Sequence, residues 1–144
     1  MADREHKIDS LTAVIGELAK QMQKKYGDEA LDVFIPILKE YGFHAGNRLT
    51  KKMADRDFPD RVAGWLEPLI NSGLSEIVER DPTHVTIRGI ACPLNLEGTN
   101  RALCDACMAI DQGLVSALAE SDISLRIEQS MARGDQSCVV HFSV

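Results

Sequence analysis

The chain has 144 residues, of which 44% are hydrophobic and 26% charged, as expected for one water-soluble globular domain with its own core. Its formal net charge of −6 argues against a nucleic-acid surface, because neutralising phosphates requires clustered lysine and arginine. The N-terminus, MADREHKIDS, lacks a secretory signal pattern, and no apolar run approaches the roughly 20 residues that span a bilayer. We therefore expect a cytoplasmic protein that binds neither nucleic acid nor membrane.

Helices are predicted at 10–27 and at 58–73 in the first half of the chain. Ser10 is a suitable N-cap for the first of these, and Gly27 is a suitable end. An apolar stripe with spacings of three and four runs along this helix and comprises Ile8, Leu11, Ile15, Leu18 and Met22.

The longest helix is predicted over 29–53, with a kink or early break at Pro36. Gly42 and Gly46 lie on one side of it, where missing side chains allow another backbone or a flat ligand to come close. Tight helix packing is the commoner reason for such glycines, and we favour it here.

The second half of the chain is rich in short β-like segments separated by turn residues, at 75–80, 83–90, 124–132 and 137–144. A helix is predicted between the second and third of these, over 101–120, and ARGDQ is predicted to be a hairpin turn. We therefore predict one α+β domain over 1–144, with a helical part, 1–73, and a strand-rich part, 74–144. The N-terminal helices pack on a twisted antiparallel sheet that carries one inserted helix.

Four cysteines follow the pattern C-x11-C-x2-C-x30-C. Cys104 and Cys107 are three residues apart near the start of the predicted helix, so their sulfurs face the same way, and the helix dipole there favours thiolates. Cys92 ends one strand, and Cys138 begins another on its core-facing side. The four side chains can therefore converge on one point.

Three interpretations of these thiols are open. Four thiolates in a reducing compartment suit tetrahedral zinc or an iron–sulfur cluster. A redox pair is the second interpretation, although the CxxC does not lie in a clear βαβ unit. The third is that some are ordinary buried cysteines, which are common in cores. We favour a zinc or iron–sulfur site.

The segments CPLNLEGTNRALCDACMAIDQGLVSAL and IEQSMARGDQSCVVHF resemble a known family pattern. This pattern is shared by the L-2-amino-thiazoline-4-carboxylic acid hydrolase-like family and by 4-vinyl-reductase-like ligand-binding domains. The resemblance runs from about Tyr26 onward, and its sharpest motif combines Glu128 with residues 134–142. It implies an α+β fold like that of haem-NO-binding and transport-particle domains, with a small-molecule pocket between its layers. Such domains are often dimeric, so we expect a small-molecule ligand and a homodimer.

The resemblance also implies metal ligands. In repressor relatives the matching cysteines hold an iron–sulfur cluster, which would place Cys92, Cys104 and Cys138 on a metal, with Cys107 as a fourth ligand. Some relatives have a further cysteine on the Glu128 strand, and here that strand has none. No helix-turn-helix precedes the domain, so a DNA-binding role is disfavoured.

Two functions compete at this stage. In the first, a hydrolase opens a 2-aminothiazoline ring at its C=N bond, using metal-bound hydroxide. Glu128 or Asp111 would act as general base, Arg101 would hold a substrate carboxylate, and His44 and Trp65 would line the substrate pocket. In the alternative, the chain is a non-catalytic small-ligand or redox-sensing or carrier module with a closed four-cysteine metal site. Three thiolate ligands favour the enzyme and four favour the binding module. We favour the metal-binding small-molecule domain, with catalysis left open.

Overall fold

The computed structural model describes residues 8–144; residues 1–7, which hold most of the charged N-terminal segment, lie outside the described residues. The first predicted helix is confirmed as α1 (Leu11–Tyr26), because the Ser10 side chain accepts a hydrogen bond from the backbone N–H of Ala13 and Gly27 ends the helix. The other N-terminal elements are a 3₁₀ turn (Asp28–Ala30), α2 (Leu31–Lys52) and α3 (Phe58–Asn71). Helix α2 continues through Pro36 without a break.

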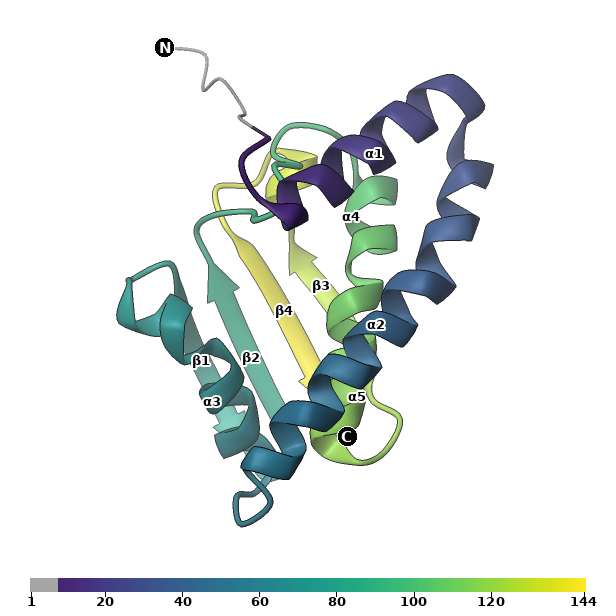
Figure 1. Ribbon diagram of the computed structural model, residues 1–144. Helices are drawn as coiled ribbons and strands as arrows, with labels where there is room; N and C mark the ends of the chain where they lie inside the picture. Colours follow the sequence, from purple (N-terminus) through teal and green to yellow (C-terminus); the bar gives the residue numbers. More distant parts are fainter. Residues whose placement is uncertain (1–7) are drawn as a thin grey trace.

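One four-stranded antiparallel sheet forms the strand-rich part, with strand order β1-β2-β4-β3 (Figure 1). The β3–β4 connection is the hairpin predicted at ARGDQ and contains a 3₁₀ turn, Met131–Arg133. Each outer strand carries one irregularity, between Ile77 and Glu79 and between Ile127 and Gln129. The strand bounds are β1 (Ser75–Asp81), β2 (His84–Gly89), β3 (Ser124–Gln129) and β4 (Cys138–Ser143).

The inserted helix is divided into α4 (Arg101–Cys107) and α5 (Ala109–Ala119), which meet at Met108. By length and composition, Arg101–Ala119 is apolar enough to cross a membrane, contrary to the sequence-based expectation. However, 56% of this apolar window is buried inside the protein, so its composition also suits the core helix of a soluble domain.

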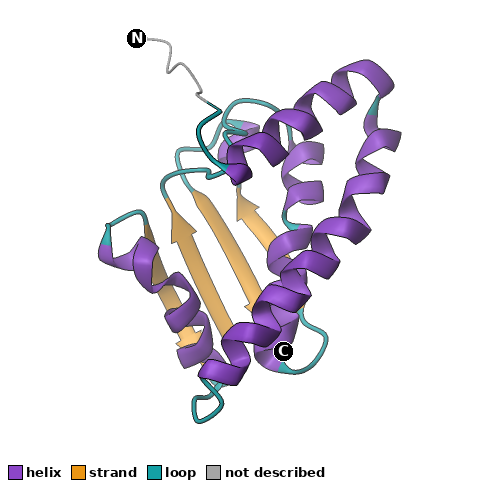
Figure 2. Cartoon of the chain, in the orientation of Figure 1, coloured by secondary structure: helices purple, strands orange, loops and turns teal. Residues whose placement is uncertain are grey.

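All helices lie on one side of the sheet (Figures 1 and 2). Helices α3 and α5 bury Val62, Val115 and Leu118 against Val85 and Phe142 of the sheet. The opposite face of the sheet is polar, because strand residues alternate between the two faces. The predicted α+β class, with helices packed on an antiparallel sheet, is therefore confirmed.

Helices α2 and α5 approach each other unusually closely. A Cβ atom on Gly42 would overlap the carbonyl oxygen of Ile110, and one on Gly113 would overlap the carbonyl oxygen of Lys39. Thr50 donates a hydrogen bond to the carbonyl oxygen of Ala117, 3.1 Å away, farther along the same contact. The glycines noted in the sequence thus serve helix packing, and the close contact leaves no space for a flat ligand between these helices.

We expect Gly42→Ala to lower the free energy of unfolding by about 1–3 kcal/mol, because the added methyl group meets backbone that cannot move aside. This loss exceeds the gain of about 1 kcal/mol in helix propensity. Urea unfolding would measure the change. Gly64→Ala in α3 is the matched control, since the Cβ there meets only flexible side chains, those of Met53 and Arg56, and no backbone. Equal stability of the two variants would contradict the close contact.

Candidate functional site

A cavity of about 410 Å³ lies between the helices and the sheet. Its wall combines α3, α4 and α5 with strands β2 and β4 and with the loop that joins β2 to α4, so both parts of the chain contribute. Most of the lining side chains are aliphatic or aromatic. The others are the four cysteines, Met108, Ser75 and Asp111. A mostly apolar cavity of this size is typical of a small-molecule site.

The loop 90–100 closes one side of the cavity and is held from outside by α1. Gly16 of α1 lies directly against the carbonyl oxygen of Leu94, where no larger residue fits. Lys20 donates a hydrogen bond to the carbonyl oxygen of Asn95 at 3.2 Å. Inside the loop, the backbone N–H of Cys92 donates to a carboxylate oxygen of Glu97 at 3.3 Å. This loop places Cys92 and neighbouring leucines on the cavity wall.

The four cysteines all reach this cavity, and all are free thiols. Burial raises the pKa of Cys107 to about 12 and is also the largest cause of the raised pKa of Cys92, Cys104 and Cys138. These thiols are therefore protonated at neutral pH, contrary to the thiolates expected near a helix N-terminus. A neutral thiol on an apolar wall behaves as a small hydrophobic group.

The predicted zinc or iron–sulfur site is wrong. Within residues 8–144, no group of three or more His, Cys, Asp or Glu side chains is arranged so that it could hold a metal ion. The thiols are scattered over the cavity wall, two on α4, one on the loop before it and one on β4, and desolvation disfavours their ionised forms. Without a metal site, the hydrolase hypothesis has no metal-bound hydroxide to attack its substrate. The closed four-cysteine metal site of the binding-module hypothesis is wrong for the same reason.

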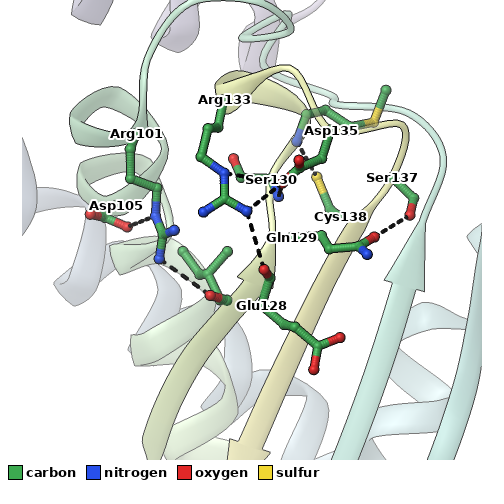
Figure 3. Close-up of polar contacts among 11 residues, drawn as sticks. Arg101, Asp105, Glu128, Gln129, Ser130, Arg133, Asp135, Ser137 and Cys138 are labelled. Carbon is green, nitrogen blue, oxygen red and sulfur yellow. Dashed lines mark hydrogen bonds and ion pairs between the residues drawn. The ribbon is translucent and has the colours of Figure 1, made fainter.

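Residues 128–138, part of the segment that resembles a family pattern, form a hydrogen-bonded turn between β3 and β4 (Figure 3), from which Cys138 reaches the cavity. Asp135 accepts hydrogen bonds from the backbone N–H of Ser130 at 2.8 Å and from the Arg133 guanidinium at 2.6 Å. Arg133 also donates to the carbonyl oxygen of Glu128. The backbone N–H of Met131 donates to the sulfur of Cys138 at 3.4 Å. The turn therefore holds Cys138 in place on the wall.

Asp111 lies in the first turn of α5, is partly buried and lines the cavity. Desolvation raises the pKa of its carboxyl group from the ordinary 3.8 to about 7. Its carboxylate has no hydrogen bond or ion pair with any residue from 8 to 144. It is therefore a polar group that faces an otherwise apolar space.

The other predicted site residues are divided between the cavity and the surface. Trp65 lines the cavity, where its ring meets that of Phe142 edge-on at 6.4 Å. His44 is exposed beside Glu40 on α2, and Arg101 pairs with Asp105 outside the cavity. Glu128 is exposed near His141, on the sheet face turned away from the helices. The general-base role of Glu128 and the substrate-binding roles of His44 and Arg101 remain predictions of the sequence.

Several wall residues were not identified from the sequence. They lie on α3, on the loop before α4 and on β4, and their apolar side chains are of the same types as ordinary core residues. Examples are Leu69, Leu94, Leu96 and Val140.

Neither a protein-family model nor a curated protein matches the chain. Among solved structures, it is similar to the phenol-responsive sensory domain of the transcription activator PoxR, solved with phenol, at 18% identity and a TM-score of 0.65. That match covers 95% of this chain and 76% of the other. It is also similar to trafficking protein particle complex subunit 3 from Naegleria fowleri, covalently bound to palmitic acid, at 16% identity and a TM-score of 0.58, with 92% of each chain covered.

These similarities show the fold alone, and they agree with the transport-particle-like architecture expected from the sequence. Neither structure is described as a hydrolase or as a metal protein. The ring-opening hydrolase expected from the sequence relied on a metal-bound hydroxide, and it is corrected together with its metal site, because residues 8–144 hold no group of side chains that could bind a metal ion.

We expect Asp111→Asn to stabilise the protein at neutral and alkaline pH. In the native protein, the stability conferred by the neutral carboxyl group is fully present below its unfolded pKa of 3.8 and is lost as the pH rises through about 7. At pH values above about 7, the free energy of unfolding of the variant should therefore exceed that of the native protein by on the order of 4 kcal/mol. In acid, the two should be almost equally stable. Urea unfolding as a function of pH measures the difference. Asp122→Asn, at an exposed loop position, is the control and should show no such pH-dependent gain.

Proposed function

We propose that the chain is a non-catalytic small-molecule-binding sensory module whose ligand occupies the cavity of about 410 Å³. The observation that carries this proposal is the character of the wall, which is almost entirely apolar and carries one carboxyl group, Asp111. Such a wall buries an apolar ligand, and a single polar group orients it. Trp65, predicted as a substrate-binding residue, lies in position to contact the ligand.

The two similar structures support a ligand between the layers of this fold. One is a phenol-responsive sensory domain and the other carries covalently bound palmitic acid. Both ligands are largely apolar, as the cavity wall here requires. Protonated thiols are poor nucleophiles, so we propose reversible binding for this chain.

The proposal also covers the family, the domain extent and the localisation of the protein. We place the chain among the 4-vinyl-reductase-like ligand-binding domains, on the strength of the motif that forms the β3–β4 turn. We further propose one domain over 1–144, since both of its parts contribute to the cavity wall. The net charge of −6 supports a cytoplasmic domain that does not itself bind nucleic acid.

The ligand site can be tested with a substitution at the exposed position Ala91, which lines the cavity. We expect Ala91→Phe to weaken binding of phenol or palmitic acid at least tenfold, or about 1.4 kcal/mol, because the new ring occupies ligand space. Trp65 is the only tryptophan in the chain and lines the cavity, so its fluorescence reports occupancy.

The matched control is Ala54→Phe, at an exposed loop position outside the cavity, which should bind like the native protein. Equal affinities of the two variants would show that the probes bind elsewhere. A native protein that unfolds cooperatively yet binds neither phenol nor palmitic acid would show that the cavity does not accept these two ligands.

We also propose that the chain forms a homodimer through α1. Part of the predicted stripe on this helix is open to solvent, with Leu11 81% and Leu18 53% exposed, while Ile15 and Met22 are half-buried. A 3.5-residue apolar repeat suits packing against a second helix. In an antiparallel pair of α1 helices, Asp9 of one copy lies near Lys24 and Lys25 of the other, so the charges are complementary. A second copy of this chain is therefore the occupant we propose.

We expect Leu18→Asp to dissociate this dimer, because a charge in the centre of an apolar helix pair is left unpaired on burial. Light scattering after size-exclusion chromatography would show a halved mass. Thr12→Asp, exposed on the same helix but outside the stripe, should leave the mass unchanged. A monomeric native protein at micromolar concentration would refute the dimer.

A further inference from the structure

The cavity wall contains one acid and no base. Among the described residues that line it, Asp111 is the only Asp, Glu, Lys, Arg or His side chain. Arginines that lie near the cavity have acidic partners outside it, as Arg133 has in Asp135 and Arg101 has in Asp105. A negative charge on Asp111 is therefore not compensated from within the wall.

Asp111 also lacks a hydrogen-bond donor. Its carboxyl group receives no hydrogen bond from any residue between 8 and 144, and the partly buried side chain lines the cavity. Buried carboxylates are normally paired with a cation or with several donors. A buried polar group without a partner, on the wall of an open space, indicates that its partner comes from outside the chain.

The chemistry of this partner follows from the charge of the wall. A ligand ammonium group supplies both a positive charge and hydrogen-bond donors, and such charge-assisted bonds are strong where water is excluded. A ligand carboxylate would be repelled by Asp111 and would find no cation. A hydroxyl group would supply one hydrogen bond but would leave the charge of the carboxylate unbalanced.

The apolar residues of the cavity wall determine the size and polarity of the rest of the ligand. Trp65 and Phe142 present aromatic surface, and aliphatic side chains and neutral thiols surround them. The volume of about 410 Å³ is at the lower end of the range for small-molecule sites. A compact apolar or aromatic body fits this surface, and a long polar molecule does not.

We propose that the ligand is a small hydrophobic amine whose protonated nitrogen pairs with Asp111 while its apolar body packs against Trp65 and Phe142. This inference rests on the proposed function, because it takes the cavity as the ligand site. It adds the charge of the ligand, which the apolar wall alone leaves undetermined.

A matched probe series tests the inference on the full chain. Phenethylamine, 2-phenylethanol and phenylacetate share a phenyl ring and differ in the charge of the end group. Titrations followed by Trp65 fluorescence at about pH 8, where Asp111 is ionised, should show phenethylamine binding at least about tenfold tighter than 2-phenylethanol. Phenylacetate should bind most weakly. Lowering the pH through about 7 should weaken amine binding, because Asp111 is then protonated.

Two variants assign the preference to this side chain. Asp111→Asn should abolish the preference for the amine over the alcohol, whereas Asp122→Asn, exposed and outside the cavity, should retain it. Equal binding of amine and alcohol by the native protein, or a preference that survives in Asp111→Asn, would overturn the amine assignment and leave the ligand cavity standing. Failure of all three probes, together with phenol and palmitic acid, would overturn the amine assignment and the proposed function together.

Discussion

The close contact between α2 and α5 is the constraint on which the site depends. Because Gly42 and Gly113 carry no side chains, the two helices meet backbone to backbone, and Ile110 lies directly against α2. The next residue, Asp111, belongs to the same turn and lines the cavity on the inner side of the helix. A larger separation of the helices would shift this turn and, with it, the one charged group of the cavity wall.

The low polarity of the cavity then determines the chemistry of every group on its wall. Desolvation raises the pKa of each of the four thiols and of Asp111, so neutral forms are favoured throughout. For the cysteines this means the loss of the thiolate, the form that binds metals and attacks electrophiles. For Asp111 it means a carboxyl group whose charge depends on what else enters the cavity. Desolvation therefore argues against the predicted metal site at the cysteines, and it is also what makes Asp111 a candidate ligand-binding group.

Local signals in the sequence predicted most of the fold correctly. The cap at Ser10, the end at Gly27 and the alternation in 83–90 and 137–144 reflect interactions within a few residues, which a sequence records directly. The division of the inserted helix at Met108 was not predicted, and of the two alternatives at Pro36, a kink or an early break, the break does not occur. Contacts with other elements override local preferences at such points.

For the site, the sequence by itself indicated that Cys92, Cys104, Cys107 and Cys138 face the same part of the core, through strand alternation and helix spacing, but not that they are scattered over a cavity wall instead of converging on one point. It could not determine their protonation, since that depends on how much water reaches each sulfur after folding. Only the tertiary structure decided that Asp111 and Trp65 share the cavity while His44, Arg101 and Glu128 lie outside it. The reason is that the position of a side chain relative to the cavity depends on how the helices pack on the sheet, and segments far apart in the sequence form the cavity wall together.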